Sequence, residues 1–244
     1  MTDDDHPLPD HTGDPNGDPT HQLVEGVLHD LWTIVNKLAK VRPTKPERYR
    51  VAVFGSARIK PGEPLYDEVK ELTRTLSELG CDIVSGGGPG LMQAANEGSQ
   101  LGDPEDQRAS IGVTIALPFE KGANPFVEQL YTHESFYTRL HQFVRLSHAF
   151  VVFGGGVGTT LESLLVWQLL QVRHLENVPF IMVGDMWREL VGWSKKHMLT
   201  STPPLANAAD LELPACVDTP AQALELLRPH IASFQEAAPG GQAR

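Results

Sequence analysis

Two glycine-rich turns are the segments of this sequence best suited to bind an anion. Residues 86–90 (Gly-Gly-Gly-Pro-Gly) and 154–158 (Gly-Gly-Gly-Val-Gly) each follow a short apolar run and precede a helix-like pattern. Glycine lets a ligand approach the backbone closely, and the N-terminus of the following helix offers free N–H groups and a partial positive charge. A single such loop would equally suit a tight turn. Because the arrangement occurs twice, we predict phosphate binding.

Three side chains lie near the second turn in the sequence. Thr159 can add a hydroxyl at the helix start, and Glu162 follows within the first helical turn. Arg139 lies on the helix that precedes the strand before this turn, so it could return to the same crevice. Each charged residue also has a simpler explanation, since a helix dipole favours a carboxylate near its N-terminus and an arginine often covers a solvated face. The residues alone leave both explanations open.

Other ligand classes have weaker support in the motifs. Neither turn matches Gly-x-x-x-x-Gly-Lys-Ser/Thr or a good Gly-x-Gly-x-x-Gly, which disfavours triphosphates and dinucleotides. None of the 10 histidines forms a His-Glu-x-x-His pair. We therefore expect neither a metal nor a cofactor.

Alternating strands and helices must position these turns. Short apolar runs predict five strands, and helical periodicity predicts the segments between them. The strands are expected at 51–54, 81–84, 111–117, 149–153 and 178–183, and the helices at 66–79, 91–98, 136–147, 159–171, 186–199 and 220–232. This alternation is typical of the α/β class, with a single doubly wound parallel sheet (Rossmann-like) and helices on both faces. Parallel sheets bind ligands beyond the carboxyl ends of their strands.

The flanking segments differ from this body. Residues 1–19 are nearly devoid of apolar side chains and are expected to be a disordered acidic tail. Residues 20–42 carry an apolar stripe at helical spacing and predict an extra N-terminal helix. We expect this stripe to be buried at a subunit boundary, or else against the helices of its own sheet. The Rossmann-like domain is expected over 43–235, with a flexible tail at 236–244.

Charge and composition narrow the partners. The net charge is −11, of which the six Asp of residues 1–20 contribute −6 and the remainder −5. A protein with this net negative charge repels polyanions, which disfavours DNA or RNA as its ligand. No membrane span or signal peptide is recognisable, and Cys81 and Cys216 suggest buried, reduced thiols. We expect a cytoplasmic protein.

Residues 154–162, Gly-Gly-Gly-Val-Gly-Thr-Thr-Leu-Glu, resemble the Pro-Gly-Gly-x-Gly-Thr-x-x-Glu signature of the LONELY GUY family, long labelled lysine decarboxylases. Residues 85–92 are similar to that family's first glycine loop, and 53–58 to its opening strand. Arg139 has the spacing of its catalytic arginine, and Leu117-Pro118-Phe119-Glu120 resembles the segment that lends a substrate-contacting glutamate. The resemblance covers about residues 48–230.

This resemblance implies an N-glycosyl hydrolase, a phosphoribohydrolase that releases free base and ribose 5-phosphate from a nucleoside 5′-monophosphate such as AMP or a cytokinin nucleotide. Its catalytic residues would be Arg139 and Glu162. It also implies a homodimer or a larger ring. The substrate-binding residues would be Gly55, Ser56, Gly86, Gly87, Gly88, Glu120, Gly155, Gly156, Val157, Gly158 and Thr159.

Three positions depart from the family pattern. Gly154 replaces the signature proline, Leu140 replaces a lysine, and Gln168 replaces a substrate-contacting threonine of plant-like members. The loss of the lysine favours an alternative, a non-catalytic nucleotide-binding or molybdenum-cofactor carrier protein of the same fold. Lysine decarboxylase activity is not expected, because no lysine at the strand ends or glycine turns could hold pyridoxal phosphate.

Overall fold

In the part of the chain that the structure describes, seven parallel strands form one sheet in the order β4-β3-β2-β1-β5-β6-β7. The structure, a computed structural model, describes residues 48–116 and 122–237. The strands are β1 (Arg50–Phe54), β2 (Asp82–Ser85), β3 (Ser110–Ile115), β4 (Gln129–His133), β5 (Ala149–Val152), β6 (Phe180–Val183) and β7 (Ala215–Val217). The chain starts at the centre with β1, moves outward to β4, and returns to β5 on the other side of β1. The doubly wound fold is thus confirmed.

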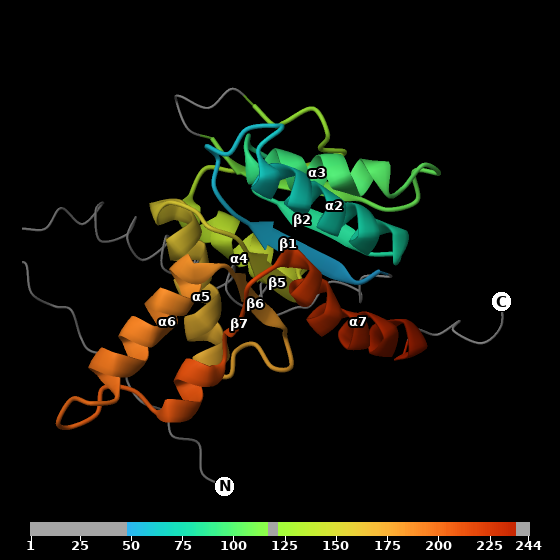
Figure 1. Cartoon of the computed structure of the whole chain (residues 1–244). Coiled ribbons are helices and arrows are strands. Elements are labelled where there is room, and N and C mark those ends of the chain that lie inside the picture. Colours follow the sequence, from blue (N-terminus) through green and yellow to red (C-terminus); the bar gives the residue numbers. More distant parts are fainter. Residues whose placement is uncertain (1–47, 117–121, 238–244) are drawn as a thin grey trace, which may run out of the picture. The chain divides into compact units, whose positions relative to one another are not determined.

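Helices cover both faces of this sheet (Figure 1). They are α2 (Pro64–Glu78), α3 (Leu91–Leu101), α4 (Phe136–Leu146), α5 (Val157–Gln171), α6 (Asp185–Met198), the short 3-10 helix η1 (Ala208–Glu212) and α7 (Pro220–Ala237). Helices α2, α3 and α7 bury their apolar faces in one core cluster, and α4, α5 and α6 bury theirs in a second cluster on the other face. Alternate residues of the central strands enter the two clusters, as the period-two geometry of a strand requires.

The sequence prediction of five strands was incomplete. The edge strand β4 has exposed residues at every position but the last, so it contains no apolar run to reveal it. Strand β7, at the other edge, has only three residues, all half-buried. Cys216 lies on β7 and is only half-buried, which corrects the expectation for that thiol, whereas Cys81 is fully buried as expected. No helix among the described residues is long and apolar enough to cross a membrane.

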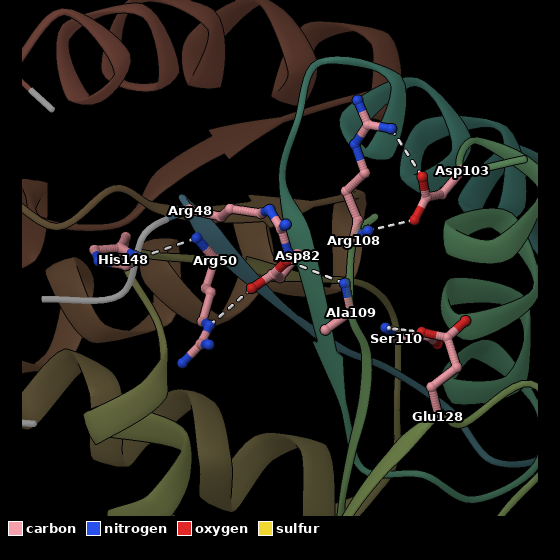
Figure 2. A network of polar contacts seen from close by, with 9 residues as sticks. All are labelled: Arg48, Arg50, Asp82, Asp103, Arg108, Ala109, Ser110, Glu128 and His148. Carbon is pink, nitrogen blue, oxygen red and sulfur yellow. Dashed lines mark hydrogen bonds and ion pairs between the residues drawn. The ribbon is translucent and has the colours of Figure 1, made fainter. Parts of the chain in front are cut away.

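Polar contacts tie the amino ends of the strands together (Figure 2). The carboxylate of Asp82, at the start of β2, accepts hydrogen bonds from Arg50 Nε of β1 (3.0 Å) and from the Ala109 amide before β3 (3.1 Å). Glu128, just before β4, accepts one from the Ser110 amide (3.0 Å). These contacts lie at the amino ends of the strands. The glycine turns lie at the opposite, carboxyl ends, and we call that side of the sheet its carboxyl edge.

The N-terminal tail and helix predicted over 1–42, and most of the C-terminal tail, lie outside the described residues. The C-terminal helix itself extends to Ala237, beyond the expected end at residue 232.

Candidate active site

Three turns meet at the carboxyl edge of the sheet, where the strand order reverses between β1 and β5. Gly55 and Ser56 follow β1, and Gly154 follows β5 after Phe153. The Ser56 amide donates to the Gly154 carbonyl (3.1 Å), and the Ser56 carbonyl accepts from the Leu91 amide at the start of α3 (2.9 Å). These two bonds link the turn after β1 to both glycine-rich turns. This is the place where open α/β sheets bind ligands.

Arg139 and Glu162 form an ion pair at this edge. Arg139 Nη1, from α4, lies 3.1 Å from Glu162 Oε1, from α5. Their side chains are only 14% and 11% exposed. Arg139 Nε also donates to the Val113 carbonyl of β3 (2.9 Å), and the guanidinium lies over the Phe143 ring, 5.3 Å from its centroid. The arginine is therefore held from three directions, which makes its position a property of the fold and not of a flexible surface side chain.

Burial raises the pKa of the Glu162 carboxyl from 4.5 to about 7, although the Arg139 charge lowers it. Desolvation disfavours the charged carboxylate, and at Glu162 this effect exceeds the attraction of the neighbouring guanidinium. A carboxyl of this kind exchanges its proton near neutral pH. Such a group suits acid–base or charge-stabilising work in catalysis.

Gly86 makes room for the arginine. A Cβ atom at Gly86 would lie 2.7 Å from Arg139 Nη2 and 2.5 Å from Met92 Sδ. Both distances are shorter than real Cβ contacts. Position 86 of the first glycine turn therefore has to be glycine, because the Arg139 side chain lies directly against the backbone there.

The second glycine turn leads into α5 without a capping side chain. Gly156 is the N-cap, and the first amide to bond back to it is that of Thr160 (3.0 Å). Val157 is 89% exposed, whereas Thr159 is buried against Gly155, where a Cβ would collide with its side chain. The first-turn amides of α5 thus have no side-chain acceptor among the described residues and are suited to an anion.

The structure brings together most of the residues singled out in the sequence. Arg139, Glu162 and the three turns share the carboxyl edge, and the Ser56 hydroxyl accepts the Arg58 amide (3.1 Å). Glu120 lies outside the described residues. Gln168, nearly two turns beyond Glu162 along α5, is exposed and donates to Gln171 (2.8 Å).

Two further residues of this region escaped the sequence analysis. His133 ends β4 and has a buried Nε2 with no hydrogen-bond partner among the described residues; burial and the nearby Arg139 charge lower its pKa. Asn124 bonds to the first glycine turn. Neither belongs to a recognisable motif, so no sequence signal identifies them.

A family model described as "Possible lysine decarboxylase" matches residues 92–227, more than half of the chain. The chain belongs to this family. The match confirms the resemblance to LONELY GUY proteins that the 154–162 signature indicated.

Among curated proteins, the pyrimidine/purine nucleotide 5′-monophosphate nucleosidase of Escherichia coli strain K12 is 31% identical over 140 residues. The same values hold for the protein of that name from strain O157:H7. The aligned part is 55% of this chain but only 30% of the relative, so the chain corresponds to less than a third of those proteins.

Solved structures share the fold. The molybdenum cofactor binding protein of Rippkaea orientalis gives a TM-score of 0.55 at 17% identity, covering 77% of this chain and 99% of that protein. The molybdenum cofactor carrier protein of Chlamydomonas reinhardtii gives 0.53 at 19% identity, covering 76% and 99%. At these identities the likeness concerns the fold alone.

Proposed function

We propose that this protein hydrolyses the N-glycosidic bond of a nucleoside 5′-monophosphate and releases the free base and ribose 5-phosphate. The observation that carries the proposal is the buried Arg139–Glu162 pair, at 3.1 Å, beside two glycine turns at the carboxyl edge. The signature and the nucleosidase name of the E. coli relatives support the same chemistry. AMP is the first substrate to test, followed by cytokinin nucleotides.

In this reaction the bond between C1′ and the base nitrogen breaks, water supplies the new C1′ oxygen, and a proton passes to the base. The transition state resembles an oxocarbenium ion. An ionised Glu162 can stabilise that charge or orient the water, because it is held in a poorly hydrated place where electrostatic interactions are strong. Arg139 binds the departing base or the phosphate through the part of its guanidinium that Glu162 and Val113 leave available.

The 5′-phosphate is assigned to the glycine turns. The uncapped amides at the start of α5 and the loop after β2 offer backbone donors, and the helix dipole favours an anion there. Binding the phosphate, which does not react, supplies energy that can be used at C1′.

We also propose a homo-oligomer. The apolar side chains of helix α5 are not confined to the face that packs on the core: Val157, Leu161 and Leu164 are 89%, 48% and 45% exposed. Their spacing of four and three residues places them on one face of the helix, and contiguous exposed apolar residues mark interaction surfaces. Phe136 at the start of α4, on the same face of the sheet, is 52% exposed. A second copy of the chain would cover this apolar surface next to the Arg139–Glu162 pair.

Free-base release from a panel of nucleoside 5′-monophosphates tests the function. Arg139→Ala and Glu162→Ala are expected to lower release from the best substrate by at least about a hundredfold, the size of a lost transition-state interaction. Arg145→Ala, an exposed arginine on the same helix, and Glu68→Ala, an exposed glutamate on α2, serve as controls and should remain active. The matching nucleoside should be a far poorer substrate than the monophosphate.

The same assay separates the enzyme from the carrier alternative. Tight nucleotide binding without base release from any member of the panel would contradict hydrolysis and favour a binding protein. Fully active Arg139→Ala and Glu162→Ala variants would contradict the assignment of the pair.

A further inference from the structure

Behind the first glycine turn lies a buried cluster of polar side chains from four separate segments. Asn96 of α3 is its centre and is completely buried. Its Oδ1 accepts from Ser85 Oγ (2.6 Å) and from Asn124 Nδ2 (3.0 Å), and its Nδ2 donates to Ser110 Oγ (2.9 Å). Buried amides and hydroxyls are costly unless they are hydrogen-bonded, so such a cluster specifies one arrangement of the segments that contribute to it.

Asn124 extends this cluster to the backbone of the turn. Its amide N–H donates to the Gly87 carbonyl (2.7 Å), and its side-chain Nδ2 donates to the Gly88 carbonyl (3.0 Å). Its Oδ1 accepts from the Phe126 amide (3.1 Å), which orients the side chain. Two successive carbonyls of the glycine turn are therefore held by one residue, which is only 9% exposed.

The direction of these carbonyls decides where the turn presents its donors. In a trans peptide the C=O of one residue and the N–H of the next point in opposite directions. With the Gly87 carbonyl directed at Asn124, the Gly88 N–H points away from Asn124. This N–H has no acceptor among the described residues. The Gly87 N–H, by contrast, is already bound to Ser85 Oγ (2.9 Å), and Pro89 has none.

We propose that Asn124 is a positioning residue that fixes the first glycine turn so that the Gly88 N–H binds the phosphate of the substrate. Its backbone N–H holds the Gly87 carbonyl, and its side chain holds the Gly88 carbonyl. The side chain also holds Asn124 itself in place, through its bonds with Asn96 and the Phe126 amide. The inference rests on the proposed function, since it assumes a phosphorylated sugar at this edge of the sheet. Asn124 does not touch the substrate. Its effect is on phosphate affinity, because a misoriented peptide would present a carbonyl oxygen, an acceptor, to an anion.

Two variants of Asn124 and one of Ser110 test this role. Asn124→Asp keeps the size and the Oδ1 acceptor but replaces the Nδ2 donor to Gly88 and Asn96 with an oxygen, and Asn124→Ala removes the side chain. Both variants keep the backbone N–H that bonds the Gly87 carbonyl, so they test how far the side chain holds Asn124 and the turn in place. Ser110→Ala is the matched control, because Ser110 bonds Asn96 and the Phe126 carbonyl (2.6 Å) in the same cluster but makes no bond to the glycine turn. Urea unfolding of each full-length protein checks that it is folded.

The expected result is a selective loss of phosphate affinity. Both Asn124 variants should raise the KM for AMP, and the Kd for ribose 5-phosphate measured by calorimetry, by about tenfold, the effect of roughly one lost hydrogen bond. The kcat should change less than about threefold. Ser110→Ala should leave both constants within about twofold of the parent.

Wild-type affinity in Asn124→Asp would overturn the proposal, and so would an equal loss of affinity in Ser110→Ala, which would mean that the cluster is only structural. The calorimetric measurement needs no turnover. If the parent protein releases no base from any nucleotide, the proposed hydrolysis fails, while the comparison of ribose 5-phosphate affinities still decides the role of Asn124. Absence of ribose 5-phosphate binding by the parent would overturn the role of Asn124.

Discussion

Replacing Glu162 by glutamine should remove a specific pH dependence of folding stability. Burial raises the pKa of this carboxyl from 4.5 to about 7 in the folded protein. Below pH 4.5 the carboxyl is protonated in the folded and unfolded chain alike and gives no difference. Between 4.5 and about 7 the folded chain retains a proton that the unfolded chain has lost, so the free energy of unfolding falls as the pH rises. Above about 7 the loss is complete.

The size of this effect follows from the shift. Each pH unit in that window corresponds to about 1.4 kcal/mol, so the full destabilisation from Glu162 is about 3 kcal/mol at pH 8 relative to pH 4.5. Glu162→Gln is close in shape and cannot ionise. It should therefore gain about 3 kcal/mol relative to the parent over this range, whatever constant offset arises from leaving Arg139 without a carboxylate partner.

Urea unfolding at pH 5, 6, 7 and 8 measures the difference. Titrations of all other groups occur in both proteins and cancel when the two curves are subtracted. Glu68→Gln, an exposed change on α2, is the control and should follow the parent at every pH. Parallel curves for the parent and Glu162→Gln would refute the reasoning, because they would mean that the carboxyl ionises in the folded protein as it does in the unfolded chain.

Two further predictions concern the glycine turn and the apolar surface. Gly86→Ala should lower base release by about tenfold or more, because the new Cβ pushes the guanidinium of Arg139 out of place. Stability should change little, because the Cβ meets only the ends of the Arg139 and Met92 side chains and no backbone atom. Activity assays and thermal melts check this against Gly192→Ala on α6, where a Cβ meets nothing within 4 Å among the described residues; equal activity of the two variants would contradict it. Leu161→Glu on α5 should reduce the molecular mass in light scattering, whereas Leu226→Glu, similarly exposed on α7, should not; a monomeric parent would reject the oligomer.

The parts of the fold that the sequence predicts are those with continuous apolar runs. The central strands β1, β2, β5 and β6 are buried on both faces, so their composition indicates them directly. Strand β4 pairs along five residues with β3 yet exposes nearly all of its side chains, and hydrogen bonds leave no trace in hydrophobic periodicity. The same reason applies to β7, whose three residues are too few for a pattern.

Of the candidate site, the sequence predicts only which strand ends and which signature residues lie at the carboxyl edge. Parallel strands place Gly86 and Gly155 at one edge, and the family signature indicates Glu162. The 3.1 Å contact of Glu162 with Arg139 depends on how α4 and α5 pack on the sheet, which no spacing rule gives. Asn124 was missed for a similar reason, because it meets Asn96 and Gly88 from 28 and 36 residues away.

The departure at Leu140 is best understood through the way Arg139 is held. The lysine that usually follows the arginine would add a second cation, and here a half-buried leucine takes its place. When Glu162 is ionised its charge offsets that of Arg139, so the ionised pair brings little net charge to the carboxyl edge. A phosphate dianion would then depend mainly on backbone donors, namely the uncapped start of α5 and the turn that Asn124 orients. Backbone donors are fixed before the substrate arrives, and their orientation is set by buried hydrogen bonds. We propose that the Gly88 N–H, held in place by Asn124, supplies part of the phosphate attraction that the leucine at position 140 cannot supply.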